Sequence, residues 1–376
     1  MRVTLPLYAG GFLGPFGGGM LVALIPNVAA GLETSLALVA AGITSYMIPF
    51  AALQLISGTV AGRVGPRRVV RTAYLVFGAS ALLCALAPSI WPFLGARAVM
   101  GAANAFLSPI LLAALSEVSA PEVLGRTVGT FAAWQTAGFM LAPAIGGALG
   151  ELSWRLAFAV VTLAALALAL PPRTLGSFQG AAESGATFRS LLNRWIALLS
   201  AKALLGYLGF TAIGFVLVLV ASQEFGLGSG ARGLLVAGYG VGGVVLGRYA
   251  GSIADRFGRP ATALAGALAS AAGVLALVFV PTVWSLALVW LAIGCAATFV
   301  WAGLNTIAVE SFPRNRAGAT SAYSAFKFAG IALAPLVYLP LFELDTRAPF
   351  LLATGFSLVL ALLVVPWFPR YRQAAA

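Results

Sequence analysis

Three cationic side chains lie inside long apolar stretches of this sequence: Arg97, Lys202 and Lys327. An ionisable residue in an apolar, membrane-length segment faces a cavity or a partner by default. The alternative for Arg97 and Lys202, which lie near the ends of their stretches, is that the long side chain snorkels to the membrane surface. We expect these cations to bind a substrate or to couple its movement to an ion.

A polar stripe follows one face of the helix predicted over residues 90–115. Its members recur at i, i+4, i+7 and i+11, and they are Arg97, Gly101, Asn104 and Ser108. The corresponding stripe in the second half of the chain is more aromatic and reads Trp290, Gly294, Ala297, Trp301 and Asn305. Tyr207, Thr211 and Gly214 form a third stripe. We predict a substrate cavity lined by Arg97, Asn104, Ser108, Tyr207, Trp290, Trp301 and Asn305.

The apolar runs contain no carboxylate or imidazole group in their interior that could serve catalysis or proton coupling. The chain has no histidine, and its ten acidic residues fall in loops or at the ends of apolar runs. Its two cysteines, Cys84 and Cys295, both lie inside apolar runs and form no metal-binding spacing. The sequence therefore predicts neither an enzyme nor a metal or other cofactor.

Lys327 is the candidate for a proton-coupling group. It shares a helical face with Tyr323 and Gly330, and its counterpart in the first half is Gln135, which cannot titrate. Burial disfavours the ammonium form of a lysine, so a lysine in the membrane can release and reload a proton, whereas an arginine stays charged. A cationic substrate and a protonated Lys327 would then exclude each other. Arg97, Lys202 and Gln135 are further coupling candidates.

The amino-acid composition predicts that lipid surrounds much of the chain. Hydrophobic residues make up 61% of the 376 residues and charged residues only 9%, against roughly 25% charged residues in soluble domains. The net charge of +12 does not indicate nucleic acid, because the arginines lie in short loops between apolar runs. We expect the partners to be lipid, a small-molecule substrate and protons, and the protein to be a monomer.

Twelve runs approach the length of about 20 apolar residues that a membrane helix needs. They cover residues 5–27, 36–61, 70–87, 90–115, 127–149, 155–171, 195–221, 230–250, 261–280, 283–308, 318–341 and 348–368. One long polar break separates the first six from the last six. The predicted fold is an all-α membrane protein of twelve transmembrane helices in two pseudo-symmetric six-helix bundles, residues 1–172 and 195–376, joined by a cytoplasmic linker, residues 173–194.

Arginine placement predicts the orientation. With the N-terminus inside, sixteen arginines lie on the cytoplasmic side and three, Arg155, Arg232 and Arg347, on the other. Cytoplasmic loops of membrane proteins carry the excess of basic residues. We therefore predict a multi-pass protein of a bacterial-type inner membrane with both termini in the cytoplasm.

The two halves repeat. At an offset of 193 residues Tyr46 maps onto Tyr239 and Gly101 onto Gly294, and one deletion later, at an offset of 192, Gly138 maps onto Gly330. Two repeats related by an axis along the membrane normal are typical of a rocking transporter.

Two loops and two helices carry a family resemblance. The segment from Gly251 to Pro260 reads GSIADRFGRP, and the segment from Gly58 reads GTVAGRVGPRR, with Gly62 where the first has an acidic residue. Phe93, Arg97 and Gly101 follow at four-residue spacing, and Gly129, Gly138, Pro143, Gly146 and Gly147 lie in the fifth run. Over its whole length the sequence resembles the major facilitator superfamily, and the fifth run resembles the motif of its drug:proton antiporters.

The resemblance implies a gating role for these loops and glycines. In that fold the fifth and eighth helices face each other, and their smooth surfaces could separate and reseal. The implied gating residues are Gly58, Arg63, Gly65, Arg67, Gly251, Asp255, Arg256, Gly258, Arg259, Gly138, Pro143, Gly146 and Gly147.

The sequence favours efflux of small amphipathic or aromatic compounds by alternating access, in exchange for protons. The alternative is exchange or facilitated transport of small organic anions, which the basic cavity without embedded acids favours. A third interpretation, a membrane-embedded enzyme or receptor, finds no nucleophile constellation and no extra soluble domain in support.

Overall fold

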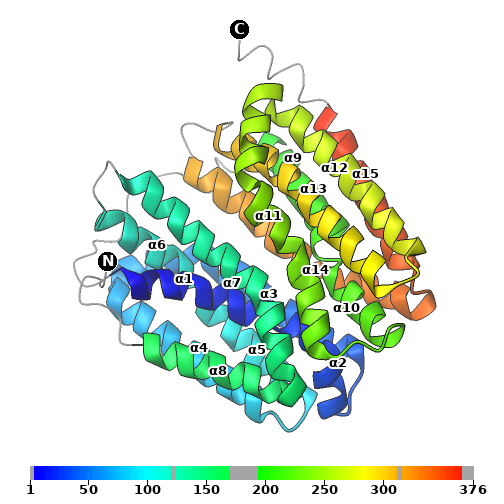
Figure 1. Cartoon of the computed structure of the whole chain (residues 1–376). Coiled ribbons are helices and arrows are strands. Elements are labelled where there is room, and N and C mark those ends of the chain that lie inside the picture. The colour runs from blue at the N-terminus through cyan, green and yellow to red at the C-terminus, as the bar shows by residue number, and fades with distance from the viewer. Residues whose placement is uncertain (1–3, 120–122, 170–193, 311–315, 366–376) are drawn as a thin grey trace. The chain divides into compact units, whose positions relative to one another are not determined.

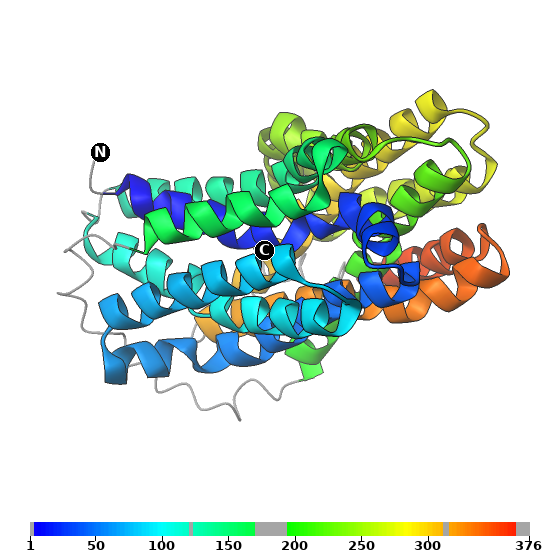
Figure 2. The same ribbon diagram turned by 90° about the horizontal axis from the view of Figure 1, so that it is seen from below.

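The structure, a computed structural model, describes residues 4–119, 123–169, 194–310 and 316–365. These residues are almost entirely helical, and they contain no β-strand. They divide into two compact units, shown in blue to green and in green to red in Figures 1 and 2. Each long helix satisfies its own backbone hydrogen bonds, which lipid requires of a spanning segment.

Unit 1 contains eight helices in the described residues. They are α1 Leu5–Gly19, α2 Leu21–Gly31, α3 Leu36–Val64, α4 Pro66–Leu86, α5 Ile90–Asn104, α6 Ser108–Glu117, α7 Leu124–Leu152 and α8 Trp154–Leu168. Within the unit α1 packs along α7, α3 along α5, and α4 between α5 and α8 (Figure 1). Ser35 and Ser153 cap α3 and α8, since their hydroxyl oxygens accept hydrogen bonds from the backbone of Leu38 and Arg155.

Unit 2 repeats this order. It contains α9 Arg194–Gly206, the π-helix η4 Tyr207–Thr211, α10 Gly214–Gln223, α11 Ser229–Phe257, α12 Arg259–Ala276, the 3₁₀ turn η5 Leu277–Phe279, α13 Val283–Glu310, α14 Arg316–Leu344 and α15 Ala348–Val364. Inside the unit α12 packs between α13 and α15, and α14 packs along α9. The first six residues of α11 do not belong to unit 2, because the segment Leu227–Leu234 is part of unit 1.

The membrane-spanning segments in the described residues match the predicted twelve. Eight segments are long and apolar enough to cross a membrane, and the bent pair α1 and α2 makes a ninth. The shorter apolar helices α8 and α15 and the 29-residue α7, which carries Gln135 and Thr136 near its middle, complete the set. The all-α, twelve-helix fold is confirmed.

The element boundaries confirm the internal repeat. Leu36–Val64 and Ser229–Phe257 are both 29 residues long and lie 193 residues apart. The same offset relates α4 to the segment Arg259–Phe279, and it relates Ile90–Glu117 to α13. One deletion later, α7 and α14 are both 29 residues long and lie 192 residues apart.

Three of the predicted runs are interrupted rather than straight. The first bends by 45° between α1 and α2 at Met20. The fourth breaks at residues 105–107, because Pro109 in the first turn of α6 has no N–H to donate to the preceding turn. The seventh contains the π-helix η4. Ser108 therefore begins a new helix, and the predicted i+11 position on one continuous helix was wrong.

The predicted division of the chain lies mostly outside the described residues. Residues 173–193 of the predicted linker are not described, and Arg194 begins α9. Boundaries at residues 172 and 195 therefore stay a prediction. What the structure adds is the association of Leu227–Leu234 with unit 1.

Candidate functional site

Unit 2 contains a lysine held against two aromatic rings. The Lys327 ammonium donates a hydrogen bond of 2.8 Å to the side-chain oxygen of Asn305. It lies 4.3 Å from the ring centre of Tyr323 and 5.1 Å from that of Trp301. Both separations fall within the roughly 6 Å over which a cation is attracted to an aromatic face. We call Trp301, Asn305 and Tyr323 the cation cage.

Helical spacing explains how the cage forms. Trp301 and Asn305 are one turn apart on α13, and Tyr323 and Lys327 are one turn apart on α14. Residues separated by four positions lie on the same helical face. Because α13 and α14 pack against each other in unit 2, the two pairs meet.

An aromatic wall continues from the cage toward the π-helix. The ring centre of Tyr207 lies 5.0 Å from that of Trp301, and Phe210 lies 5.6 Å from it. The wider backbone turn of η4 presents both Tyr207 and Phe210 to Trp301, and π-helical turns are frequent at functional sites. Trp301 and Lys327 are half-buried and Asn305 is exposed, whereas Tyr323 is buried.

Trp290 belongs to a neighbouring cluster rather than to the cage. It is 1% exposed, packs 5.0 Å from the ring centre of Tyr239, and donates a hydrogen bond to the backbone oxygen of Val236. Tyr239 in turn shares a 2.9 Å hydrogen bond with Thr211 in η4. This cluster supports the π-helix from the side of α11.

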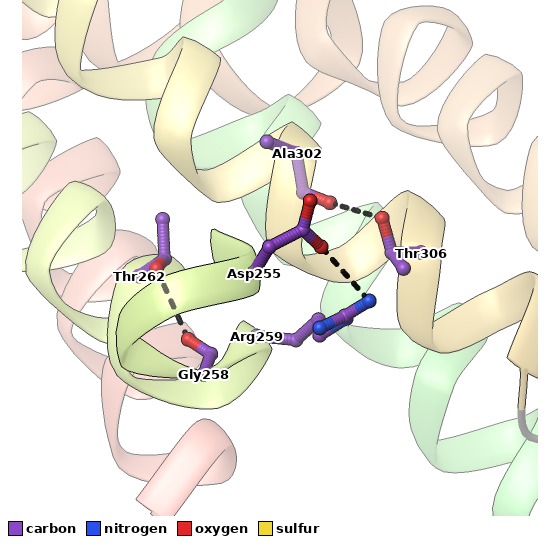
Figure 3. A network of polar contacts seen from close by, with 6 residues as sticks. All are labelled: Asp255, Gly258, Arg259, Thr262, Ala302 and Thr306. Atoms are coloured by element: carbon purple, nitrogen blue, oxygen red, sulfur yellow. Dashed lines mark hydrogen bonds and ion pairs between the residues drawn. The ribbon is translucent and has the colours of Figure 1, made fainter. Parts of the chain in front are cut away.

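No carboxylate accompanies the lysine in the described part of the chain. Asp255, near the end of α11, forms an ion pair of 3.0 Å with Arg259, the first residue of α12 (Figure 3). The charge of Lys327 is therefore balanced by an amide oxygen and two ring faces. Burying a charge without such groups would be costly.

Arg97 occupies a different kind of site, inside unit 1. Its guanidinium donates to the backbone oxygens of Gly17 at 2.9 Å and Gly18 at 3.1 Å, and its Nε donates to that of Gly42 at 3.2 Å. The guanidinium also lies 4.5 Å from the ring centre of Tyr46, and the side chain is 0% exposed. Gly17 and Gly18 precede the bend between α1 and α2, so Arg97 satisfies carbonyl groups at the end of α1.

The other predicted residues of unit 1 lie nearby or on other faces. Asn104 and Ser108 are buried. The side-chain oxygen of Asn104 faces Gly14 and has no hydrogen-bond partner among the described residues. Gln135 is half-buried on α7. Lys202, in unit 2, is 1% exposed on α9. The Lys327 ammonium contacts Asn305 and Trp301, and the ring of Trp301 in turn packs against that of Tyr207.

The two signature loops share one backbone conformation. Gly65 ends α3 with φ 97°, and Gly258 ends α11 with φ 95°. Only glycine adopts this region without strain. Arg63, Arg67 and Arg256 have exposed side chains. Figure 3 shows the Asp255–Arg259 pair beside Thr306 of α13.

The α7 motif lines close helix contacts inside unit 1. Gly138 packs against the backbone of Phe12, and Gly146 against Met20. A Cβ on Gly147 would lie 2.2 Å from the backbone oxygen of Ser229, and Gly233 is equally tight against Pro143. Only small residues allow backbones to approach this closely.

Sequence reasoning missed the polar contacts beside this motif. Glu151 at the end of α7 accepts a 2.6 Å hydrogen bond from the backbone N–H of Gly230, at the start of α11. Arg232 donates to the side-chain oxygen of Asn27 in α2. A carboxylate at a helix N-terminus is favourable, so Glu151 stabilises the first turn of α11. Gly228 and Gly230, where a Cβ would meet Glu151, were the available signal.

Tyr323 and Tyr239 were also absent from the predicted cavity. Tyr323 has a buried hydroxyl without a hydrogen-bond partner among the described residues. Its position four residues before Lys327 was the signal for the cage. Tyr239 was visible only as the repeat counterpart of Tyr46.

Two repeated bundles of apolar helices with charged and aromatic groups inside them define a membrane transporter rather than an enzyme. The family profile of the Major Facilitator Superfamily matches residues 7–202 and again residues 199–376. The chain belongs to the major facilitator superfamily.

Curated relatives are similar over limited stretches. A multidrug resistance protein B homolog of Mycobacterium tuberculosis is 36% identical over 137 residues, covering 35% of this chain and 25% of that protein. The methylenomycin A resistance protein of Streptomyces coelicolor is 30% identical over 174 residues, covering 45% and 36%. The chain thus spans about a quarter to a third of the length of these relatives.

A solved structure extends the likeness to the whole fold. The nucleoside transporter NupG, in a variant form, matches with a TM-score of 0.80 over 97% of this chain and 100% of that chain. At 16% identity the likeness concerns the fold alone.

Proposed function

We propose that this transporter exports small amphipathic or aromatic compounds by alternating access, in exchange for protons. The observation that carries the proposal is the cluster of Lys327, Trp301 and Tyr207 in unit 2. It combines a wall of tilted aromatic rings with a lysine on a half-buried face. Ligand sites of this kind are mostly apolar, with a few placed polar groups.

Two further observations support efflux. The relatives include proteins named for resistance to multiple drugs and to methylenomycin A. Gly138, Gly146 and Gly147 of α7, which belong to the segment that resembles the antiporter motif, lie in close helix contacts inside unit 1.

Transport of small organic anions is the second candidate. Lys327 has no carboxylate partner in the described part of the chain, and an unpaired cation attracts anions. Under this alternative Lys327 would bind the substrate's acidic group directly.

Reconstituted transport separates the candidates. Liposomes containing the protein and an acidic lumen should accumulate a lipophilic cationic dye faster than protein-free liposomes, and collapse of the pH gradient should abolish the difference. Accumulation of labelled benzoate without an effect of the gradient would support the anion candidate. If neither probe moves, the efflux proposal is wrong.

A further inference from the structure

The ammonium of Lys327 lies among groups that could equally bind the cationic group of a ligand. Three groups converge on it: the face of Tyr323, the face of Trp301 and the side-chain oxygen of Asn305. Aromatic faces and amide oxygens all present negative potential. An anion at the same point would meet two ring faces and an oxygen, so the geometry selects cations.

We propose that the cation cage is the subsite for the ammonium group of a substrate, and that Lys327 occupies it as a tethered substitute when no substrate is bound. The inference rests on the proposed efflux function and names its substrate class: aromatic or alkyl ammonium compounds. Aromatic cages are a common way for proteins to bind quaternary ammonium groups.

The surroundings of the cage fit the rest of such a compound. Asn305 is exposed and Trp301 half-buried, so the cage is open on one side. The rings of Tyr207 and Phe210 continue the wall from Trp301, at 5.0 and 5.6 Å between ring centres. A flat apolar group joined to the ammonium can lie along this wall, where aromatic pairs favour offset or tilted packing.

Displacement of Lys327 gives a reason for proton exchange. An ammonium displaced from the cage loses its hydrogen-bond acceptor and both ring faces, and it then lies beside the cationic substrate in apolar surroundings. Both the apolar surroundings and the neighbouring positive charge disfavour the ammonium form, so Lys327 transfers its proton to a water molecule and becomes a neutral amine. One substrate cation then enters as one proton leaves, and the charge of the site is unchanged.

No acid in the described part of unit 2 would retain the displaced ammonium. The titratable groups on the elements packed around α14 are Lys202 of α9, Tyr207 of η4 and, next to them, Tyr239 of α11. On α14 itself they are Tyr323, Tyr338 and, at the far end, Glu343. Along α10, α13 and α15 the remaining titratable residues are the half-buried Cys295 of α13 and Glu310, the last residue of α13.

Binding of benzyltrimethylammonium to the purified protein tests the proposal. This probe carries a permanent charge and donates no hydrogen bond, so its affinity reports the ring faces. By calorimetry, Lys327→Met should bind it about tenfold more tightly than wild type at neutral pH, because a competing cation of similar attraction is removed. Wild-type affinity should rise with pH, and the affinity of Lys327→Met should not.

Substitutions in the cage, each paired with a control substitution, test whether these residues bind the probe. Trp301→Leu should weaken binding by about tenfold, whereas Trp284→Leu, an exposed tryptophan on the same helix, should not. Tyr323→Phe, which keeps the ring, should bind like wild type, and Tyr323→Leu should not. The circular dichroism and elution profile of each variant check its folding.

Two outcomes would overturn the inference. One is unchanged or weaker probe binding in Lys327→Met. The other is benzoate binding to wild type that Lys327→Met abolishes. If dye accumulation in liposomes persists alongside either outcome, efflux stands and the cage assignment fails. If the cage binds as expected but no cation is transported, the efflux proposal fails on its own.

Discussion

Arg97 and Lys327 are both cations within membrane spans, yet their partners differ. Arg97 is enclosed by three backbone carbonyl oxygens and the Tyr46 ring, and it is fully buried. Lys327 has one hydrogen bond in the described structure and is half-buried. A guanidinium with a fixed fork of donors suits permanent contacts, whereas an ammonium on a flexible stem can leave its site. We therefore assign Arg97 to positioning α1 and Lys327 to exchange.

Arg97→Ala should lower stability as well as transport. The substitution leaves the carbonyl oxygens of Gly17, Gly18 and Gly42 without their donor, at a cost of about 1–3 kcal/mol for each buried group left unpaired. Thermal unfolding followed by size-exclusion chromatography measures the difference, with Arg97→Lys as the partial replacement. An Arg97→Ala protein of wild-type stability and transport would show that the contacts are dispensable.

Lys327→Arg should uncouple transport from the pH gradient. Arginine keeps its charge throughout the cycle, so it cannot release the proton that the exchange requires. In liposomes the variant should transport a cationic dye at less than about a tenth of the wild-type rate, and the residual rate should be the same with and without the gradient. A wild-type response to the gradient in this variant would exclude Lys327 as the proton carrier.

Individual helices were predicted well where the sequence is uniformly apolar, and poorly where the backbone departs from a regular α-helix. The bend at Met20 and the π-helix at Tyr207 interrupt the equivalent first helices of the two repeats. No residue pattern in these runs predicts a π-turn, because it depends on packing between helices. The cage was therefore only partly visible: Trp301, Asn305 and Lys327 were found by helical spacing, but the contact between α13 and α14 was not.

Glycine pairs set how closely the repeated helices approach. A Cβ on Gly101 would lie 2.0 Å from the backbone oxygen of Tyr46, and one on Gly294 would lie 2.1 Å from that of Tyr239. These two contacts are repeat counterparts, so both units use the same close helix crossing.

Alanine at either glycine should force the two helices apart. We expect Gly101→Ala and Gly294→Ala each to cost about 1–3 kcal/mol, the usual penalty of an overpacked core. Gly95→Ala on the same helix as Gly101 is the matched control, because a Cβ there meets nothing within 4 Å. Unfolding midpoints in one detergent compare the three. Equal midpoints for Gly95→Ala and Gly101→Ala would mean that α3 and α5 can adjust freely.

Over the whole molecule, the internal repeat was the sequence feature that predicted the most of the fold. Conserved spacing between Tyr46 and Gly101, and between Tyr239 and Gly294, translates directly into matching contacts in the two units. The placement of charged residues in the sequence predicted fewer of the contacts. Glu151 and Arg232 read as loop charges in the sequence, and only tertiary packing brings them to Gly230 and Asn27.

The predicted orientation can be tested by cysteine accessibility. A background without Cys84 and Cys295 removes both native thiols. Single cysteines are then placed at Arg67, in the first turn of α4, and at Gln223, at the end of α10. Both positions are exposed, whereas Ser229, the first residue of α11, is buried and would label poorly. The arginine excess places Arg67 in the cytoplasm and Gln223 outside. A membrane-impermeant maleimide added to intact cells should therefore label Gln223→Cys and spare Arg67→Cys, and lysed cells should label both. The reverse pattern in intact cells would invert the topology, and with it the direction in which protons would have to move through unit 2 to drive efflux.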